Sequence, residues 1–180
     1  EAVAGAKFLC YGTLSQRNEV SRSTLMKILQ DFKGMKIYDF NYRESIYDWE
    51  PLFKESVKYA DVLKLNEDEV AMVKQAYGHT GDDRSCALEL LGEHNLKYIF
   101  ITMGEKGAVL FTKDSMLQVP APSVEVVDTT GCGDAFTAAI AYSLLKGLDE
   151  KKMLEYCVSV AAKVATVNGA VPEQLSFQPS

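Results

Sequence analysis

The chain contains 180 residues, of which 47% are hydrophobic and 24% charged, and it carries a formal net charge of −6. These values are ordinary for a globular domain with a substantial core. The acidic balance and the lack of a basic stripe argue against a nucleic-acid partner. No apolar run approaches the roughly 18 residues needed to cross a bilayer, so no membrane partner is expected.

The four cysteines form no C-x-x-C pair of the kind that holds zinc, and three of them lie in apolar or helical contexts. This usage favours a reducing compartment over a disulfide framework. The first residues also lack the basic, apolar and small-residue order of a secretory leader. We therefore expect a cytoplasmic protein.

Hydrophobic periodicity alternates along the chain between the strand period and the helix period. The expected elements, in chain order, are a strand at 7–11, a helix around 25–32 stopped by Gly34, strands at 35–40 and 61–65 separated by a helix at 49–59, helices at 67–76 and 84–94, a strand at 98–102, a hairpin of 107–112 and 116–119, a strand at 124–127, and helices at 134–145 and 151–167. Strands alternating with helices predict an α/β fold, doubly wound, with a largely parallel sheet and helices on both faces. About seven short strands are too few for an eight-fold βα barrel.

The segment with the clearest chemical character is the run Asp-Thr-Thr-Gly-Cys-Gly-Asp at 128–134. Two glycines bracket one small residue between an expected strand and an expected helix, so the backbone can turn tightly and approach a ligand. Unpaired amides and the helix dipole favour an anion at such a helix start. Asp134 ends this turn, where a carboxylate can accept a proton from an attacking hydroxyl.

Other interpretations of this segment have to be weighed. Asp134 could simply cap the following helix. The G-x-G-x-x-G pattern of a dinucleotide fold is broken by Phe136, and Asp149 and Glu150 begin a helix instead of ending a strand. No G-x-x-x-x-G-K-[ST] sequence occurs, which excludes a P-loop.

Residues 128–134 closely resemble the second signature of the PfkB, or ribokinase-like, carbohydrate kinases, with Cys132 in place of the usual alanine. The resemblance implies that Asp134 is the general base for the acceptor hydroxyl. It also implies that the amides of Gly131, Cys132 and Gly133 stabilise charge on the transferred phosphoryl group.

Further segments match the same family in order. Asn41 and Arg43 stand in a D-x-N-x-R pattern and are expected to contact substrate or phosphate; alone, Arg43 could be a surface arginine. Asn66 and Glu69 match N-x-x-E, which implies an indirect role in holding Mg²⁺; the same residues could also start and cap a helix. The residues implied in nucleotide binding are Thr102, Gly104, Gly107, Thr130, Asn168, Gly169 and Ala170.

The resemblance covers nearly the whole chain and corresponds to the C-terminal portion of the family. It implies ATP and Mg²⁺ as cofactors, with a monovalent cation near Asp128 and Thr130 in some relatives, and a small-molecule sugar as the substrate. We expect residues 1–180 to be one nucleotide-binding and catalytic portion of a longer chain, inactive by itself and homo-oligomeric. Fructokinase is the favoured activity; a nucleoside or vitamin kinase of the same superfamily, or a non-catalytic nucleotide-binding fragment, are the alternatives.

Overall fold

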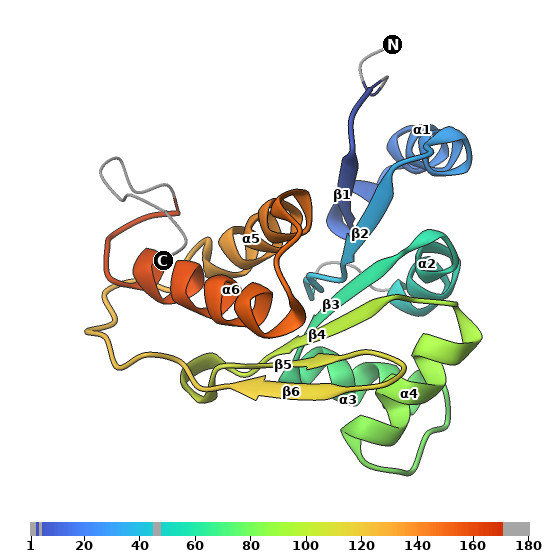
Figure 1. Cartoon of the computed structure of the whole chain (residues 1–180). Helices are drawn as coiled ribbons and strands as arrows, with labels where there is room; N and C mark the ends of the chain where they lie inside the picture. The colour runs from blue at the N-terminus through green and yellow to red at the C-terminus, as the bar shows by residue number, and fades with distance from the viewer. Residues whose placement is uncertain (1–2, 4, 45–47, 171–180) are drawn as a thin grey trace. The chain divides into compact units, whose positions relative to one another are not determined.

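The computed structural model describes residues 3, 5–44 and 48–170. The chain divides into two compact units: Glu1–Ile101 with Phe111–Ser115, and Thr102–Leu110 with Met116–Ser180. Figure 1 labels the helices and strands of both units. The expectation of a single ribokinase-like portion over residues 1–180 stays a prediction.

The first unit holds four strands in sheet order β1-β2-β3-β4. Its elements are β1 (Phe8–Gly12), a 3₁₀ turn (Leu14–Gln16), α1 (Glu19–Asp31), β2 (Met35–Asp39), α2 (Trp49–Ser56), a 3₁₀ turn (Val57–Tyr59), β3 (Val62–Asn66), α3 (Glu67–Ala76), α4 (Asp83–Glu93) and β4 (Tyr98–Thr102), whose last residue belongs to the second unit. β1 pairs with β2 and β2 with β3 in parallel, as predicted.

Side-chain caps fix where the helices of the first unit begin. The Asn18 carboxamide oxygen accepts from the amides of Val20 and Ser21 at the start of α1. The Asp82 carboxylate does the same for the Ser85 amide at the start of α4. Each cap satisfies amides that have no partner within the helix, so the polar residues before the apolar periodic runs set the helix boundaries.

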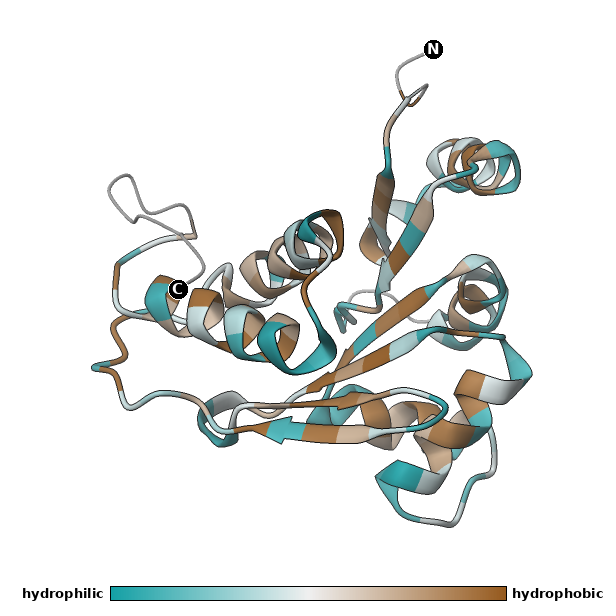
Figure 2. Cartoon of the chain, viewed as in Figure 1, coloured by the Kyte–Doolittle hydropathy of each residue, from teal (hydrophilic) through white to brown (hydrophobic). Residues whose placement is uncertain are grey.

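Aromatic and aliphatic residues from the strands and α2 form the core of the first unit. Tyr38, Phe40 and Phe53 are fully buried, and the rings of Phe40 and Phe53 lie 4.9 Å apart between centroids. Figure 2 shows that β3 and β4 are largely hydrophobic, as expected for strands covered on both faces.

The second unit contains a 3₁₀ turn (Gly104–Lys106), β5 (Ala108–Phe111, whose last residue belongs to the first unit), β6 (Met116–Val119), α5 (Cys132–Lys146) and α6 (Glu150–Ala165). β5 and β6 are sheet neighbours, which agrees with the predicted hairpin. The helices α5 and α6 lie side by side and bury Phe136, Ile140, Leu154 and Cys157. Burial raises the pKa of the Cys157 thiol to about 12, so this cysteine is an inert core residue.

Two local predictions were wrong. Residues 124–127 form no strand; the amides of Val127 and Asp128 donate instead to the Ala165 carbonyl oxygen at the end of α6, at 2.8 and 3.2 Å. The helix after the glycine turn starts at Cys132 with Gly131 as its cap residue, so Asp134 lies in the first turn and does not cap it. No helix within the described ranges has both the length and the apolar character needed to span a membrane.

Candidate active site

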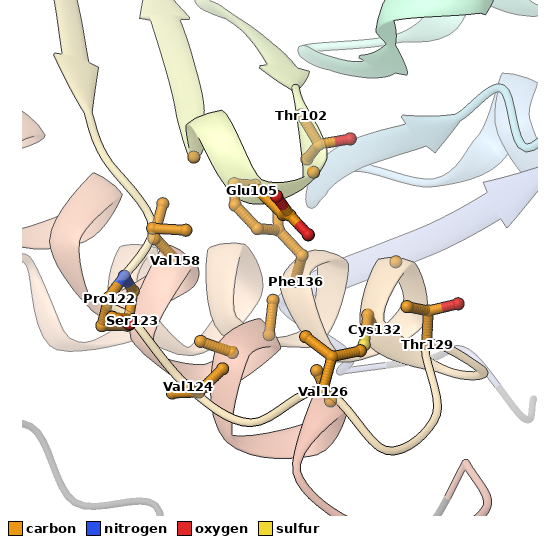
Figure 3. A pocket seen from close by; sticks show the side chains of 17 residues that line it. Thr102, Glu105, Pro122, Ser123, Val124, Val126, Thr129, Cys132, Phe136 and Val158 are labelled. Atoms are coloured by element: carbon orange, nitrogen blue, oxygen red, sulfur yellow. The ribbon is translucent and has the colours of Figure 1, made fainter.

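A cavity of about 630 Å³ lies within the second unit (Figure 3). This volume falls in the usual range for small-molecule sites. Its lining residues are Thr102, Gly104, Glu105, Gly107, Ala121, Pro122, Ser123, Val124, Val126, Thr129, Cys132, Gly133, Phe136, Val158, Ala161, Ala162 and Ala165. The cavity therefore joins two segments that are far apart in sequence, the turn after β4 and the start of α5.

Several residues predicted from sequence line this cavity, and others do not. Five of them do: Thr102, Gly104, Gly107, Cys132 and Gly133. Among the described residues, the lining does not include the predicted Thr130, Gly131, Asp134, Asn168, Gly169 and Ala170. These six belong to the same unit, next to or behind the start of α5.

One wall of the cavity is apolar and was missed by the sequence analysis. Val124 and Val126 are 36% and 50% exposed, although valine is usually buried. Ala161, Ala162 and Ala165 of α6 complete this wall with small side chains. An apolar surface of this kind can hold an aromatic ring system. The alternating valines that follow Pro120 and Pro122 were a usable signal, but they were interpreted as a strand.

The turn between β4 and β5 is shaped by two glycines with positive φ. Gly104 has a φ of 55° and Gly107 a φ of 92°. The Met103 amide donates to the Gly107 carbonyl oxygen at 2.8 Å, and the Gly107 amide donates to the Gly104 carbonyl oxygen at 3.0 Å. A Cβ atom at Gly107 would lie 1.9 Å from the Val119 carbonyl oxygen, so only glycine fits there.

The Asp128 carboxylate links the loop before α5 to the segment after α6. Asp128 accepts from the Thr130 amide at 2.8 Å and from the Gly169 amide at 3.0 Å. Gly131 turns with a φ of 82°, and a Cβ atom there would lie 2.8 Å from the Cα of Ala170. Of the predicted residues Asn168, Gly169 and Ala170, the last two therefore contact the loop that carries the glycine turn.

Replacing Asp128 by asparagine leaves one acceptor oxygen for two amides, because the new NH₂ group cannot accept a hydrogen bond. We expect that oxygen to keep the local bond to the Thr130 amide two residues on, so the Gly169 amide is released. The Thr130 amide and hydroxyl and the Gly169 amide hold the pKa of Asp128 below its ordinary value of 3.8. A lowered folded-state pKa means that the stabilisation is present above the ordinary value and is lost as the pH falls through the lower one.

In the unaltered protein we therefore expect the Gly169 amide to stay protected from hydrogen exchange at pH 5 and to lose protection on further acidification. In Asp128→Asn we expect this amide to be unprotected at any pH. NMR-detected exchange measures this. Asp149→Asn is the matched control, since Asp149 caps α6 through the Lys152 amide. Equal protection of Gly169 in Asp128→Asn and in the unaltered protein would contradict the prediction.

Asp134 is exposed and sits in the first turn of α5, where helix geometry leaves amides without intrahelical acceptors. Of the amides expected to form an anion hole, that of Cys132 donates to the Thr129 carbonyl oxygen at 3.2 Å. Burial, and then the Asp128 carboxylate, raise the pKa of the Cys132 thiol. Cys132 is therefore a small neutral side chain here, as the alanine of the family pattern would be.

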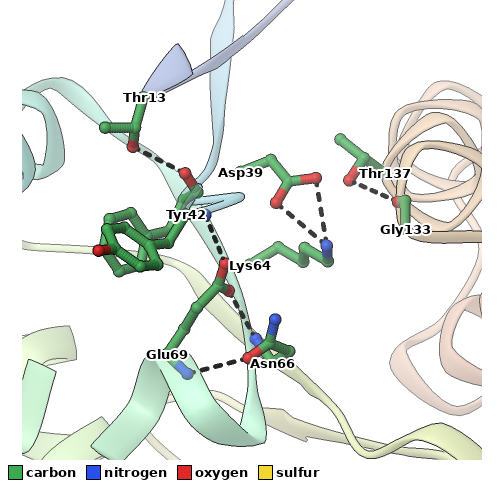
Figure 4. Close-up of polar contacts among 9 residues, drawn as sticks. Thr13, Asp39, Tyr42, Lys64, Asn66, Glu69, Gly133 and Thr137 are labelled. Atoms are coloured by element: carbon green, nitrogen blue, oxygen red, sulfur yellow. Dashed lines mark hydrogen bonds and ion pairs between the residues drawn. The ribbon is translucent and has the colours of Figure 1, made fainter. Parts of the chain in front are cut away.

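The remaining predicted residues, Asn41, Arg43, Asn66 and Glu69, lie in the first unit. Asn66 caps α3 in a reciprocal capping box with Glu69, so the predicted helix start is present (Figure 4). Arg43 is exposed, and Asn41 has a positive φ of 41°.

The same end of the first unit contains a buried ion pair that the sequence analysis missed. The Lys64 ammonium lies 3.1 and 3.3 Å from the two carboxylate oxygens of Asp39 (Figure 4). Both side chains are at least nine-tenths buried. The lysine between two leucines in β3 was the available signal.

The implied cofactors can be tested against this geometry. The cavity's size, apolar wall and two glycine turns suit a nucleotide. Over the described ranges, no three His, Cys, Asp or Glu side chains converge as a metal site. Mg²⁺ does not require such a cluster, since it is usually held by one or two carboxylates, water and the phosphates of its nucleotide.

Comparison with known proteins supports the fold and the family. Fructokinase-2 of Oryza sativa subsp. japonica is 33% identical over 186 residues, with 96% of this chain and 54% of that protein covered. The ribokinase structure from Thermotoga maritima has a TM-score of 0.76 at 27% identity, covering 94% of this chain and 53% of that one. The fructokinase of Vibrio cholerae O395, with fructose, ADP and calcium ion bound, has a TM-score of 0.74 at 26% identity, covering 91% and 56%.

These structures define the class of protein: the fold is ribokinase-like, with a largely parallel sheet and helices, as predicted. The family model described as "pfkB family carbohydrate kinase" matches residues 1–175. The chain therefore belongs to the pfkB family of carbohydrate kinases. It spans about half the length of the relatives named above.

Proposed function

We propose that this chain carries the nucleotide-binding and catalytic part of an ATP-dependent sugar kinase. The observation that carries the proposal is the second-unit cavity, which is lined both by the glycine turn of Gly104 and Gly107 and by Cys132 and Gly133 at the start of α5. Glycine turns and helix starts are the parts of a protein that bind phosphate without a side-chain charge.

In the proposed reaction the adenine ring lies against the apolar wall, and the phosphates extend toward α5. Asp134 takes the proton of the sugar hydroxyl while the hydroxyl oxygen forms a bond to the γ-phosphorus. The bond from that phosphorus to the β,γ-bridging oxygen breaks, and ADP leaves. The amides of Gly131 and Gly133, and that of Cys132 when it leaves the Thr129 carbonyl oxygen, stabilise the charge on the phosphoryl oxygens.

Further roles follow the family pattern. Thr102, Thr130 and the segment Asn168–Ala170 support the nucleotide site, the last by holding the turn at Gly131. Asn41 and Arg43 contact the substrate or the transferred phosphate. Asn66 and Glu69 are the residues that the family pattern would place near a bound Mg²⁺, acting on it indirectly; the ion would supply positive charge to offset that of the phosphate oxygens. A monovalent cation near Asp128, a cytoplasmic location and a homo-oligomeric state belong to the same proposal.

A second candidate function is a non-catalytic nucleotide-binding module. It is favoured by one observation: every residue that lines the cavity belongs to the second unit. A nucleotide could bind there without any acceptor sugar.

One experiment separates the two functions. A coupled ADP-release assay is run on the complete natural protein and on residues 1–180, with fructose, ribose and related sugars, with and without excess EDTA. We expect sugar-dependent, EDTA-sensitive turnover from the complete protein, and nucleotide binding by calorimetry with little turnover from residues 1–180. Nucleotide binding without sugar-dependent turnover in the complete protein would favour the binding module.

A further inference from the structure

The Glu69 carboxylate connects two segments of the first unit (Figure 4). One oxygen, Oε1, accepts from the Tyr42 amide at 2.7 Å, and the other, Oε2, accepts from the Asn66 amide at 2.8 Å. Glu69 is only 3% exposed to solvent. Each oxygen is therefore engaged with backbone, and the side chain is enclosed by the protein.

The Tyr42 amide belongs to the segment that follows β2 and carries Asn41 and Arg43. Earlier in this segment, both backbone polar groups of Phe40 are hydrogen-bonded. The Phe40 amide donates to the Lys64 carbonyl oxygen at 3.1 Å, and the Phe40 carbonyl oxygen accepts from the Thr13 hydroxyl at 2.7 Å. Asn41 then turns with a φ of 41°, a conformation that non-glycine residues seldom adopt. The bond from Tyr42 to Glu69 is thus the next backbone anchor, and it lies one residue before Arg43.

The surroundings of Glu69 make the bond to the Tyr42 amide depend on the charge and the length of the Glu69 side chain. Burial raises the pKa of the Glu69 carboxyl, while the amides of Asn66 and Tyr42 and the nearby Lys64 oppose this effect and Asp39 adds to it. Lys64 is itself paired with Asp39, so the two amides are the direct partners of Glu69. Loss of one acceptor oxygen would leave a part-buried amide without its partner, which is costly.

We infer that Glu69 is a positioning residue for phosphoryl transfer: it holds the Tyr42 amide and thereby the turn that presents Asn41 and Arg43. The inference rests on the proposed kinase function and extends it. It assigns to Glu69 a mechanical task in this chain, distinct from the influence on Mg²⁺ that its motif implies. Small displacements of a positioned group lower the rate steeply, by up to about 10²-fold for 1 Å.

The test uses two variants of the complete natural protein. Glu69→Gln keeps the size but turns an NH₂ group toward one of the two amides. Glu69→Asp keeps the negative charge, and so its electrostatic attraction for Mg²⁺, but is one methylene too short to bridge both segments. Asp68→Asn is the matched control, because it removes one carboxylate from the same helix turn at an exposed position.

We expect both Glu69 variants to lower kcat by about 10- to 100-fold with less than a twofold change in KM for Mg·ATP. Asp68→Asn should match the unaltered protein. Combining Glu69→Gln with Arg43→Gln should cost little more than Arg43→Gln alone, because the two residues act through one turn. Additive losses, full activity of Glu69→Asp, or rescue of Glu69→Gln by excess Mg²⁺ would overturn the inference.

A second readout does not depend on turnover. The Tyr42 amide should lose protection from hydrogen exchange in both Glu69 variants and keep it in Asp68→Asn. Unchanged protection in the Glu69 variants would overturn the inference even if the protein is a sugar kinase. Absence of sugar-dependent turnover in the unaltered protein, with Tyr42 protected by Glu69, would instead count against the kinase function and confine Glu69 to a structural role.

Discussion

Asp134→Asn is expected to lower kcat of the complete natural protein at least about 10²-fold, the size of a typical general-base contribution. Asparagine has nearly the same size as aspartate but cannot take the proton of the attacking hydroxyl. Because Asp134 is exposed and does not line the cavity, nucleotide affinity should change little. Steady-state kinetics and calorimetry with ATP measure the two quantities separately.

The control for Asp134→Asn is Glu19→Gln. Glu19 is an exposed acidic residue in the first turn of α1, so its neutralisation repeats the loss of a carboxylate near a helix start. It should leave kcat unchanged. Near-normal turnover by Asp134→Asn, or a large loss of ATP affinity with kcat retained, would rule out Asp134 as the base.

Gly107→Ala should destabilise the second unit by about 3 kcal/mol or more, the combined size of backbone strain and overpacking. Gly107 has a φ of 92° and a ψ of −131°, which an alanine rarely adopts. The new methyl group would also meet the Val119 carbonyl oxygen at 1.9 Å and the Ala121 amide nitrogen at 2.7 Å. Backbone atoms cannot move aside as a flexible side chain can. Urea denaturation of purified protein measures the loss.

Gly104→Ala separates the two causes. Gly104 lies in the same turn with a φ of 55°, but a Cβ atom there has no heavy atom within 4 Å. Replacing Gly104 by alanine should lower the free energy of unfolding only by the cost of the left-handed backbone conformation, about 1 kcal/mol. Equal losses in the two variants would mean that the contact with Val119 contributes nothing.

Local signals in the sequence predicted most elements well. The helix Glu67–Ala76 and the strand Tyr98–Thr102 occur with the predicted limits. In the first case, Asn66 and Glu69 form a capping box that ends the preceding strand and starts the helix. In the second, β-branched and aromatic residues run without interruption between polar ends, so a buried strand was the favoured interpretation.

Contacts between distant segments could not be predicted in the same way. Residues 124–127 have strand-like composition, yet the amide at the end of this segment, that of Val127, donates to the carbonyl oxygen of Ala165, about 40 residues later. The bond from Asp128 to the Gly169 amide joins residues 41 positions apart. The sequence marked the glycine turn at Gly131 as a site, but not the support behind it or the apolar wall beside it.

The cavity of the second unit has a thermodynamic consequence. All of its lining residues come from Thr102–Leu110 and Met116–Ser180. A ligand that binds there loses its whole set of contacts when this unit unfolds, so binding raises the unit's free energy of unfolding by linkage. At a free ligand concentration of 100 Kd the gain is about 2.7 kcal/mol. The ligand concentration in the cell would then influence how often this unit unfolds, and therefore how quickly proteases degrade the chain.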